Sequence, residues 1–316
     1  MRIGLTVDSA CDLPRTYLDR NNVVVLPIAV KIDNTVFSDE RDPDATLRFY
    51  RESLGERGHQ AETLPYTVEQ IRELFLTRLV CDFDFVFCLT ITSTRSPIHE
   101  NCVTASREIL RFYHPIRQEA GLKGIFQMRV IDSQTLFAGQ AIGVLEAVKM
   151  IEAGESHTAI YERLGFLAKN TYAYMLPRDL YYLRARAAKK GDKSVSWFNA
   201  AMGTALDIKP LLQAYRGQTG AVGKAKGFEG GSKLLLGYVA DRVRKGLLSP
   251  YVNLSYGGEL EKLYALPGYD NLARTCEQHD VEMGATGMSI TGMVNVGEGA
   301  LTVGFAAEPH TPIFKA

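Results

Sequence analysis

Short apolar runs alternate with longer amphipathic segments through the first half of the chain. The runs Arg2–Val7, Phe83–Ile91 and Met128–Ile131 are too short for helices and are typical of buried strands. The segments between them follow a helical period, as Thr67–Leu79 does. This alternation predicts βαβ units and a parallel sheet, in which the C-terminal ends of the strands share one edge.

Each of these three predicted strands runs into short polar side chains, at Asp8-Ser9, Thr92-Ser93 and Asp132-Ser133. Ligands of open α/β sheets bind at the C-terminal edge, so these side chains are candidates for a site that holds a polar or anionic group. The same residue types also favour the N-caps of helices, because their oxygens accept free backbone N–H groups. Both interpretations remain open at this point.

A second predicted strand covers Val23–Ile32, and Pro27 within it indicates an edge position or a bulge. Asp33-Asn34 is a plausible hairpin turn with Thr35–Phe37 as the return strand. Further helices are predicted over the following segments: Asp42–Ser53, His99–Tyr113 and Gln140–Ala153. We place a domain boundary just after these elements, which gives an N-terminal α/β domain (1–155) with the strand-edge site and a C-terminal α/β domain (156–316).

The second half predicts a mixed or antiparallel sheet with helices. Ile160–Lys169 and Lys233–Gly246 have helical character, Thr171–Met175 has strand character, and Met288–Ala307 alternates strand-like runs with glycines. Within the last segment, Gly297-Glu298-Gly299-Ala300 is either a tight turn between strands or a place where the backbone approaches another group closely.

Composition narrows the class of protein. The 316 residues are 46% hydrophobic, and Lys plus Arg equals Asp plus Glu at 36 each, so no global charge favours nucleic acid or an anionic membrane as partner. The five cysteines show no C-x-x-C spacing, which indicates free thiols in a reducing compartment. No apolar run is long enough to cross a bilayer and no signal-peptide pattern opens the chain, so we expect a cytoplasmic protein.

The sequence contains no P-loop, no metal-ligand spacing of histidines and no nucleophile elbow. In Gly227–Lys233 the serine precedes the lysine, so the stretch is not a phosphate-binding P-loop and is interpreted as a flexible turn. The six histidines lack metal-ligand spacing, and we expect neither a metal nor a cofactor. Ser93 and His99 could form a nucleophile and its base, but the G-x-S-x-G elbow is absent.

Five blocks in a fixed order resemble the DegV family, which includes the fatty-acid-binding B subunits of bacterial fatty-acid kinase. Asp8–Pro14 is similar to the family's D-S-x-x-D-L-P start, and Ile91–Ser96 resembles its S-S-x-x-S-G segment. The other blocks are similar to V-x-D-S, N-I-K-P-I-L and G-x-G-A-L: Val130–Ser133, Ile208–Leu212 and Gly297–Leu301. They span nearly the whole chain.

The resemblance implies a two-domain fold with a long acyl chain buried between the domains. The family's head-group contacts fall on Thr63 in the segment similar to T-S-Q-P, and on Ser93, with Thr92 beside it. The third contact, a His in H-x-G-x-G, is replaced here by Asn295. Glu62 next to Thr63 would repel a carboxylate, so we expect it to face solvent.

Three departures from the family pattern concern the turn after the third strand and the surface expected to meet the kinase subunit. Pro97 replaces a glycine, Arg184–Ser196 lacks the L-x-x-G-G-R-I motif, and Gly217–Gly231 lacks the usual arginines. These changes imply that acyl binding persists more readily than phosphotransfer.

The resemblance therefore implies a lipid carrier without catalysis of its own, whose ligand is a long-chain fatty acid. It names an ATP-binding kinase subunit as the candidate partner, and the departures above leave open whether that partner is used. Two alternatives remain. One is an enzyme that acts on a small anionic substrate at the strand edge with Ser93 as nucleophile. The other is an interaction protein that kept the fold and lost the ligand.

Overall fold

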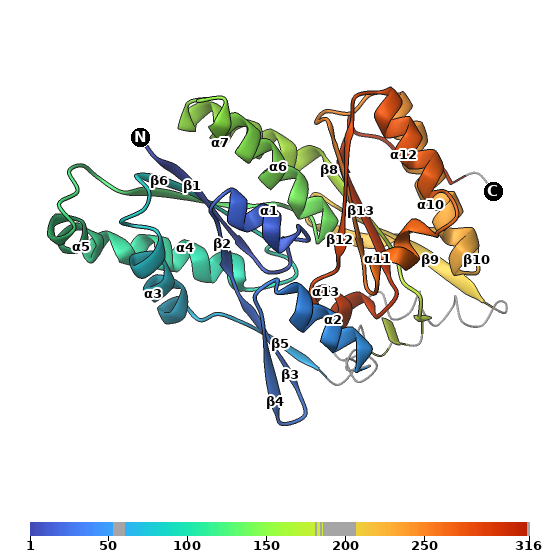
Figure 1. Cartoon of the computed structure of the whole chain (residues 1–316), viewed down its shortest axis with the longest axis horizontal. Helices are drawn as coiled ribbons and strands as arrows, with labels where there is room; N and C mark the ends of the chain where they lie inside the picture. The colour runs from blue at the N-terminus through green and yellow to red at the C-terminus, as the bar shows by residue number, and fades with distance from the viewer. Residues whose placement is uncertain (53–60, 181, 184, 186–206, 315–316) are drawn as a thin grey trace.

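The computed structural model describes residues 1–52, 61–180, 182–183, 185 and 207–314, and this part of the chain is built on three sheets (Figure 1). The first is a four-stranded sheet in the order β2-β1-β6-β7, in which every pair is parallel. Its strands are β1 (Ile3–Asp8), β2 (Val23–Leu26), β6 (Phe85–Thr90) and β7 (Gln127–Asp132). The predicted parallel N-terminal sheet is confirmed.

The second sheet has six strands in the order β10-β9-β8-β13-β11-β12. Only the β11–β12 pair is parallel, so the prediction of a mixed C-terminal sheet is also confirmed. The strands are β8 (Thr171–Leu176), β9 (Ile208–Tyr215), β10 (Gln218–Lys226), β11 (Tyr251–Tyr256), β12 (Glu282–Gly287) and β13 (Leu301–Ala306).

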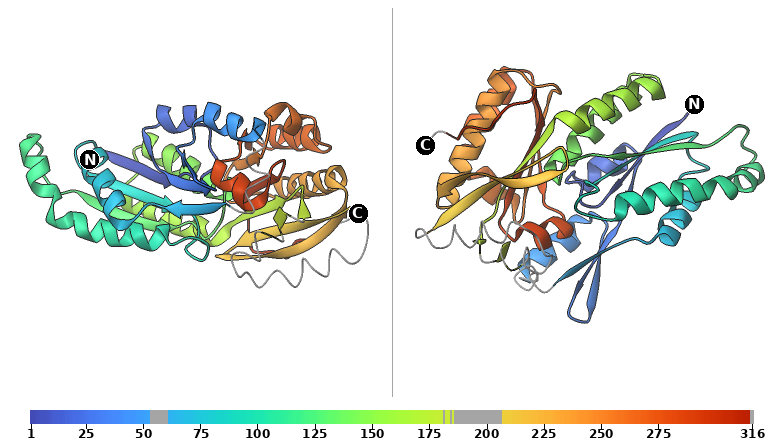
Figure 2. Two further views of the ribbon diagram at one scale, coloured as in Figure 1. Left: turned by 90° about the horizontal axis from the view of Figure 1, so that it is seen from below. Right: turned by 180° about the vertical axis from the view of Figure 1, so that it is seen from behind.

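The third sheet is small and antiparallel, in the order β4-β3-β5, with β3 (Ile28–Ile32), β4 (Thr35–Asp39) and β5 (Glu62–Pro65). The single strand predicted over residues 23–32 is wrong, because Pro27 separates β2 and β3, which belong to different sheets. The hairpin turn that begins at Asp33 (φ 51°) is confirmed. Figures 1 and 2 show this hairpin projecting from the body of the molecule.

Helices cover both faces of the parallel sheet. On one face α3 (Val68–Arg78) and α4 (Ile98–Glu108) pack against Val86 and Cys88, and on the other α6 (Ala138–Glu152) and α7 (His157–Asn170) pack against alternate residues of β6. Every residue of β6 is buried, as expected for a parallel strand covered on both sides. Thr67 closes a capping box at the start of α3, in agreement with the predicted helix.

The helix α6 lies between the parallel sheet and the six-stranded sheet (Figure 1). Ten of its residues are buried, since it meets apolar side chains on both sides. A Cβ added to Gly304 on β13 would lie only 2.3 Å from the Ala138 carbonyl oxygen, so glycine permits backbone contact between helix and strand here. The division into domains at residue 155 stays a prediction.

Two expectations for the second half are wrong. Residues 228–233 are not a flexible turn but the first turns of α10 (Phe228–Arg244), which Gly227 precedes with a positive φ of 69°. Residues 290–296 are not strand-like but form α13 (Ile290–Val296). The turn at 297–299 is present, with φ values of 101° and 68° at its two glycines, but it joins a helix to a strand.

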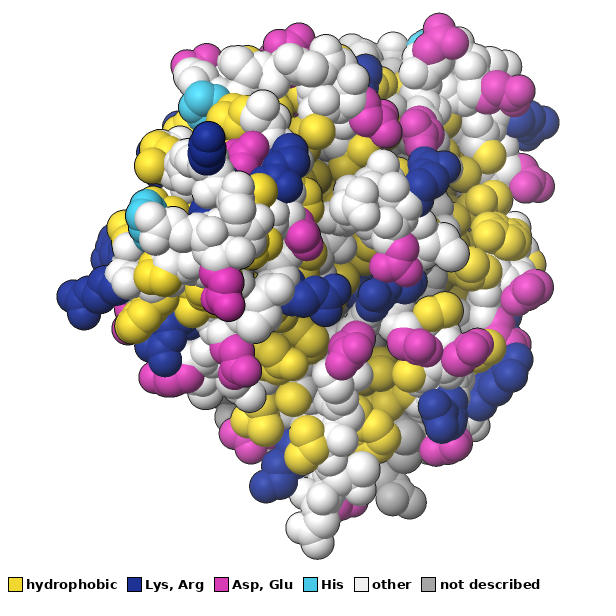
Figure 3. Space-filling model, turned by 60° about the vertical axis from the view of Figure 1, so that its left-hand side comes forward, with side chains coloured by type: hydrophobic (Ala, Val, Ile, Leu, Met, Phe, Trp, Pro, Cys, Tyr) yellow, Lys and Arg dark blue, Asp and Glu magenta, His cyan; other side chains and the backbone are white. Residues whose placement is uncertain are grey.

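The remaining helices are short or lie at the periphery. They are α1 (Arg15–Arg20), α2 (Pro43–Arg51), the 3₁₀ turn η2 (Ile109–Arg111), α5 (Tyr113–Glu119), α11 (Leu260–Tyr264) and α12 (Tyr269–Gln278). On the face seen in Figure 3, basic and acidic side chains are interspersed with apolar ones, in keeping with a formal net charge of zero. The departure from the family pattern at residues 184–196 lies outside the described residues apart from position 185.

Candidate functional site

The C-terminal ends of β1, β6 and β7 lie at one edge of the parallel sheet, and a buried carboxylate joins the first two. Asp8 accepts hydrogen bonds from the Ile91 backbone N–H (2.6 Å), the Ala10 N–H (3.1 Å) and Gln140 Nε2 (3.3 Å). Burial raises the pKa of Asp8 to about 6, because desolvation of the charged form outweighs these three hydrogen bonds.

A second carboxylate joins β6 to β7 at the same edge. The Ser93 hydroxyl donates to Asp132 Oδ2 at 2.6 Å, and the Ser93 N–H donates to the same oxygen at 3.2 Å. Asp132 Oδ1 in turn accepts from the Gln134 N–H at 2.8 Å. Ser93 is exposed, so its hydroxyl lies at the surface of the edge with its single proton committed to Asp132.

The helix-cap interpretation of these polar residues is wrong. The helices α1, α4 and α6 begin after Pro14, Pro97 and Phe137, and none has a side-chain cap bond. The polar side chains instead hold turns and neighbouring strands. Ser9 Oγ, for example, accepts from the Ile28 N–H at the start of β3 (3.1 Å).

The hairpin between β9 and β10 packs onto this edge. Thr94 Oγ1 donates to the Gly217 carbonyl at 2.6 Å and lies 3.3 Å from Thr92 Oγ1, while the Gly217 N–H donates to the Gln134 carbonyl at 2.8 Å. Gly217 has a φ of 75°, which favours glycine. The sequence interpretation missed this contact, although a glycine between two strand-like runs is a usable signal for a hairpin tip.

Thr63 lies on the small sheet with its side chain toward the apolar interior. It pairs with Val30, which is fully buried and pairs on its other side with Phe37. Paired residues share a face of a sheet, so the half-buried side chain of Thr63 lies on the same face as Val30. Its neighbour Glu62 is exposed, which confirms the expectation that this carboxylate faces solvent.

Asn295 lies on α13, which packs against β3 of the small sheet. It is half-buried, and its Nδ2 donates to the Thr291 carbonyl at 2.7 Å within the helix. Ser289 is the N-cap of α13, and its hydroxyl accepts a hydrogen bond from the Gly292 N–H at 3.0 Å.

One apolar cluster contains a neighbour of each of the three predicted contacts. Ile91 lies near Ser93 in the sequence, Val30 pairs with Thr63, and Val294 and Val296 flank Asn295. All four belong to a single buried cluster that also takes residues from the parallel and six-stranded sheets, among them Val86, Met175 and Leu212. Polar groups at a strand edge therefore adjoin a continuous apolar interior.

A cluster of buried charged side chains, formed by Asp12, Asp39 and Arg41, was not predicted from the sequence. Asp12 accepts from Arg41 Nη1 (3.3 Å), the Ser289 N–H (2.9 Å) and the Ser255 hydroxyl. Burial raises the pKa of Asp12, and the Arg41 charge opposes that rise. Asp39 on β4 accepts from the Thr291 N–H at 2.8 Å. The Asp12 bonds tie the loop after β1 to the six-stranded sheet and to the start of α13, and the Asp39 bond ties β4 to α13.

The proposed serine–histidine pair is not what the contacts show. His99 Nδ1 bonds the Thr90 hydroxyl at 2.9 Å, while Ser93 bonds Asp132. Within the described ranges, His, Cys, Asp and Glu side chains form no group of three or more that could hold a metal ion. The same part of the chain contains no helix with the length and apolar character needed to cross a membrane. All five cysteines are free thiols, as predicted.

Comparison with known proteins agrees with this architecture. Residues 2–308 match the family described as uncharacterised proteins of the DegV family, and the chain belongs to that family. A DegV domain-containing protein of Xanthomonas axonopodis pv. citri is 56% identical over 310 residues, which are 98% of this chain and 99% of that protein.

Two more distant relatives carry names that state a ligand. A Thermotoga maritima protein named fatty acid-binding protein is 25% identical over 98% of both chains. A solved DegV family structure from Thermus thermophilus, described by its fatty acid binding, superposes with a TM-score of 0.73 at 21% identity, covering 98% of this chain and 100% of that one. This superposition establishes the fold.

Proposed function

We propose that this protein binds a long-chain fatty acid, with the acyl chain in the apolar cluster and the carboxylate at the strand edge. The observation that carries the proposal is the cluster itself, which contains neighbours of Thr63, Ser93 and Asn295 in the sheet or in the sequence. The named ligands of the Thermotoga maritima and Thermus thermophilus relatives support it.

The energetics favour a site in which the acyl chain is buried and the carboxylate stays at the strand edge. Burial of an acyl chain contributes about 0.8 kcal/mol per CH₂, while a carboxylate carried into the interior without donors would be strongly unfavourable. We assign Ser93 and Thr63 as hydroxyl donors to the carboxylate, with Thr92 and Asn295 beside them. The division at residue 155 and a cytoplasmic location belong to the same proposal.

The proposal includes presentation of the bound acid to an ATP-binding kinase subunit. Asn295 determines how strongly binding depends on pH and how readily an acyl phosphate forms. A neutral amide donates a hydrogen bond but neither titrates nor transfers a proton, unlike the histidine of the family pattern. We expect binding of the acid with little pH dependence from that residue and weak acyl-phosphate formation. Reconstitution with a related kinase subunit and ATP measures the second expectation, and robust turnover would contradict it.

The direct experiment is mass spectrometry of protein purified from bacteria. The denatured sample should release a free fatty acid at a sizeable fraction of one per chain. Delipidated Thr63→Val should bind the acid about tenfold more weakly, since a hydrogen bond to a charged group contributes roughly 1.5–3 kcal/mol. Ser93→Ala should weaken binding less, because the Ser93 proton is already donated to Asp132. Thr77→Val, at an exposed position on α3, is the matched control. A protein that carries no lipid and binds no added fatty acid would contradict the proposal. A stable adduct of Ser93 with a serine-reactive probe would favour the enzyme alternative.

A further inference from the structure

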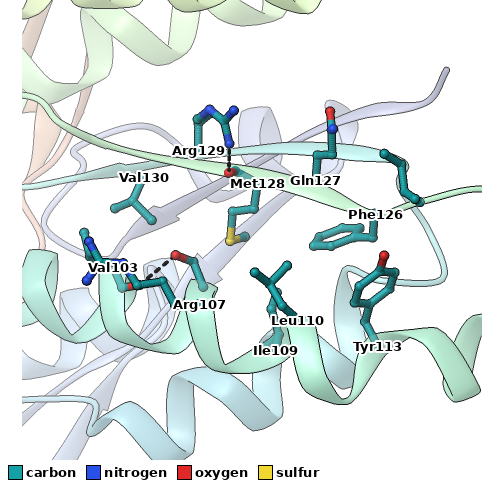
Figure 4. A pocket seen from close by; sticks show the side chains of 12 residues that line it. Val103, Arg107, Ile109, Leu110, Tyr113, Phe126, Gln127, Met128, Arg129 and Val130 are labelled. Carbon is teal, nitrogen blue, oxygen red and sulfur yellow. Dashed lines mark hydrogen bonds between the residues drawn. The ribbon is translucent and has the colours of Figure 1, made fainter.

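The strand β7 is the outer strand of the parallel sheet and pairs, among the described residues, with β6 alone. A groove of about 570 Å³ runs along this edge, between β7 on one side and α4, η2 and α5 on the other. Figure 4 looks onto it. Met128 and Val130 point toward the helices, while Gln127 and Arg129 point to the opposite side. Ile109 and Phe126 on the inner wall of the groove belong to the apolar cluster, but none of the residues assigned to the carboxylate lines the groove.

The backbone of β7 carries a carbonyl at this edge whose side-chain partner, within the described part of the chain, is the next residue. The Met128 carbonyl accepts from Arg129 Nη1 at 3.1 Å, that is, from the side chain of the next residue (Figure 4). Edge strands with unpaired backbone groups are templates for an added strand. Hydrogen bonding from the main chain is something a peptide supplies and an acyl chain does not.

The chemistry of the groove walls determines which side chains an added strand must carry to bind there. Toward the helices they are apolar, and Leu110 and Ile125 at its rim are exposed by 59% and 62%. The charged residues of the lining are Arg107 and Arg129, both exposed, and none of the described lining residues carries a carboxylate. The nearby Glu108 is already paired with Arg72 at 2.6 Å.

We propose that the β7 edge binds an extended segment of a partner protein whose side chains alternate between apolar and acidic. Successive residues of a strand point to opposite faces, so the apolar set would pack on α4 while the acidic set would meet Arg129. Arg107 on α4 supplies a second positive charge at the rim. The groove thus combines main-chain pairing, an apolar wall and charge complementarity in one site.

The test uses the full chain and a fluorescein-labelled peptide of alternating valine and glutamate, titrated by anisotropy. Binding should saturate and slow hydrogen exchange of the β7 amides. Arg107→Glu and Arg129→Glu should each weaken it by about fivefold or more, and Arg78→Glu, an exposed arginine of α3 outside the groove, should not. A valine–lysine peptide, and one with prolines at alternate positions, should fail to bind.

Several results would overturn the proposal. They are the absence of saturable binding at millimolar peptide, binding that both groove variants retain, and β7 amides that exchange at an unchanged rate. Co-sedimentation with phosphatidylglycerol–phosphatidylcholine vesicles that Arg107→Glu and Arg129→Glu abolish would assign the groove to an anionic membrane surface instead. Unfolding curves and bound fatty-acid content of the two variants should match wild type, which separates this test from the fatty-acid proposal.

Discussion

The hydrogen bond between Ser93 and Asp132 makes a prediction about ligand affinity that can be worked out from the contacts. The Ser93 hydroxyl has one proton, and Asp132 Oδ2 accepts it at 2.6 Å. A fatty-acid carboxylate that uses this donor must take it from Asp132, so one charge-assisted hydrogen bond replaces another with little net gain. Asp132 therefore competes with the ligand for the proton.

Asp132→Asn should remove the competition with little change of shape. The amide Nδ2 can donate to Ser93 Oγ, which frees the hydroxyl proton, while Oδ1 can still accept from the Gln134 N–H. The longer bond from the Ser93 N–H to Oδ2 (3.2 Å) is lost in this orientation. The freed bond to a carboxylate contributes roughly 1.5–3 kcal/mol, which corresponds to an affinity gain of about tenfold to a hundredfold. Loss of a like charge acts in the same direction.

The assay is a direct titration of delipidated protein with a long-chain fatty acid. Asp241→Asn removes one exposed carboxylate from α10 and is the control for net charge. The double variant Asp132→Asn with Ser93→Ala should lose the gain, since the two residues act as one unit. If Asp132→Asn binds at or below the affinity of wild type with an unchanged unfolding midpoint, the assignment of Ser93 as a carboxylate donor is refuted.

Three further predictions concern stability. Asp12→Ala leaves Arg41 buried without its carboxylate and should cost about 3–5 kcal/mol in urea unfolding; a loss under about 1 kcal/mol would contradict the buried pair. Since burial raises the pKa of Asp8 from an ordinary value near 3.8 to about 6, native protein keeps a proton there that unfolded protein releases. Stability should fall by about 3 kcal/mol between roughly pH 4 and 7, and Asp8→Asn should reduce that slope; identical pH profiles would rule this out. Gly304→Ala should prevent close packing of α6 and destabilise severely, as thermal unfolding would show, whereas Gly220→Ala, which has open space around its Cα, should not.

The N-terminal architecture was largely predictable because its signals are local. Buried parallel strands appear as short apolar runs, and the helices between them keep their period and caps. What local pattern could not supply was the sheet to which each run belongs. Pro27 indicated an interruption, but the transfer of β3 to a separate sheet depends on packing against α13 and β5.

The glycine-rich start of α10 is hard to predict from sequence because glycine also favours flexible turns. A Cβ on Gly231 would lie 2.8 Å from Leu176 Cδ1, so the glycine permits α10 to pack closely on β8. Burial overrode intrinsic propensity in the same way at α13, where the β-branched residues Ile290, Thr291 and Val294 favour a strand. For the candidate site, the sequence located the hydroxyls of Thr92 and Ser93 at the strand edge, but not Asp132 as the partner of Ser93.

The bonds of Asp12 also have a consequence for the order of folding. Its backbone and side-chain partners Asn253, Ser255 and Ser289 lie 241, 243 and 277 residues further along the chain. At about 5–20 residues per second, Ser289 leaves the ribosome roughly 15–60 s after Asp12. During that interval the Asp12 carboxylate can pair with Arg41 but cannot accept from Ser255 or Ser289. The parallel sheet can therefore assemble early during translation, but the loop that follows its first strand is completed only when almost the whole chain has been made.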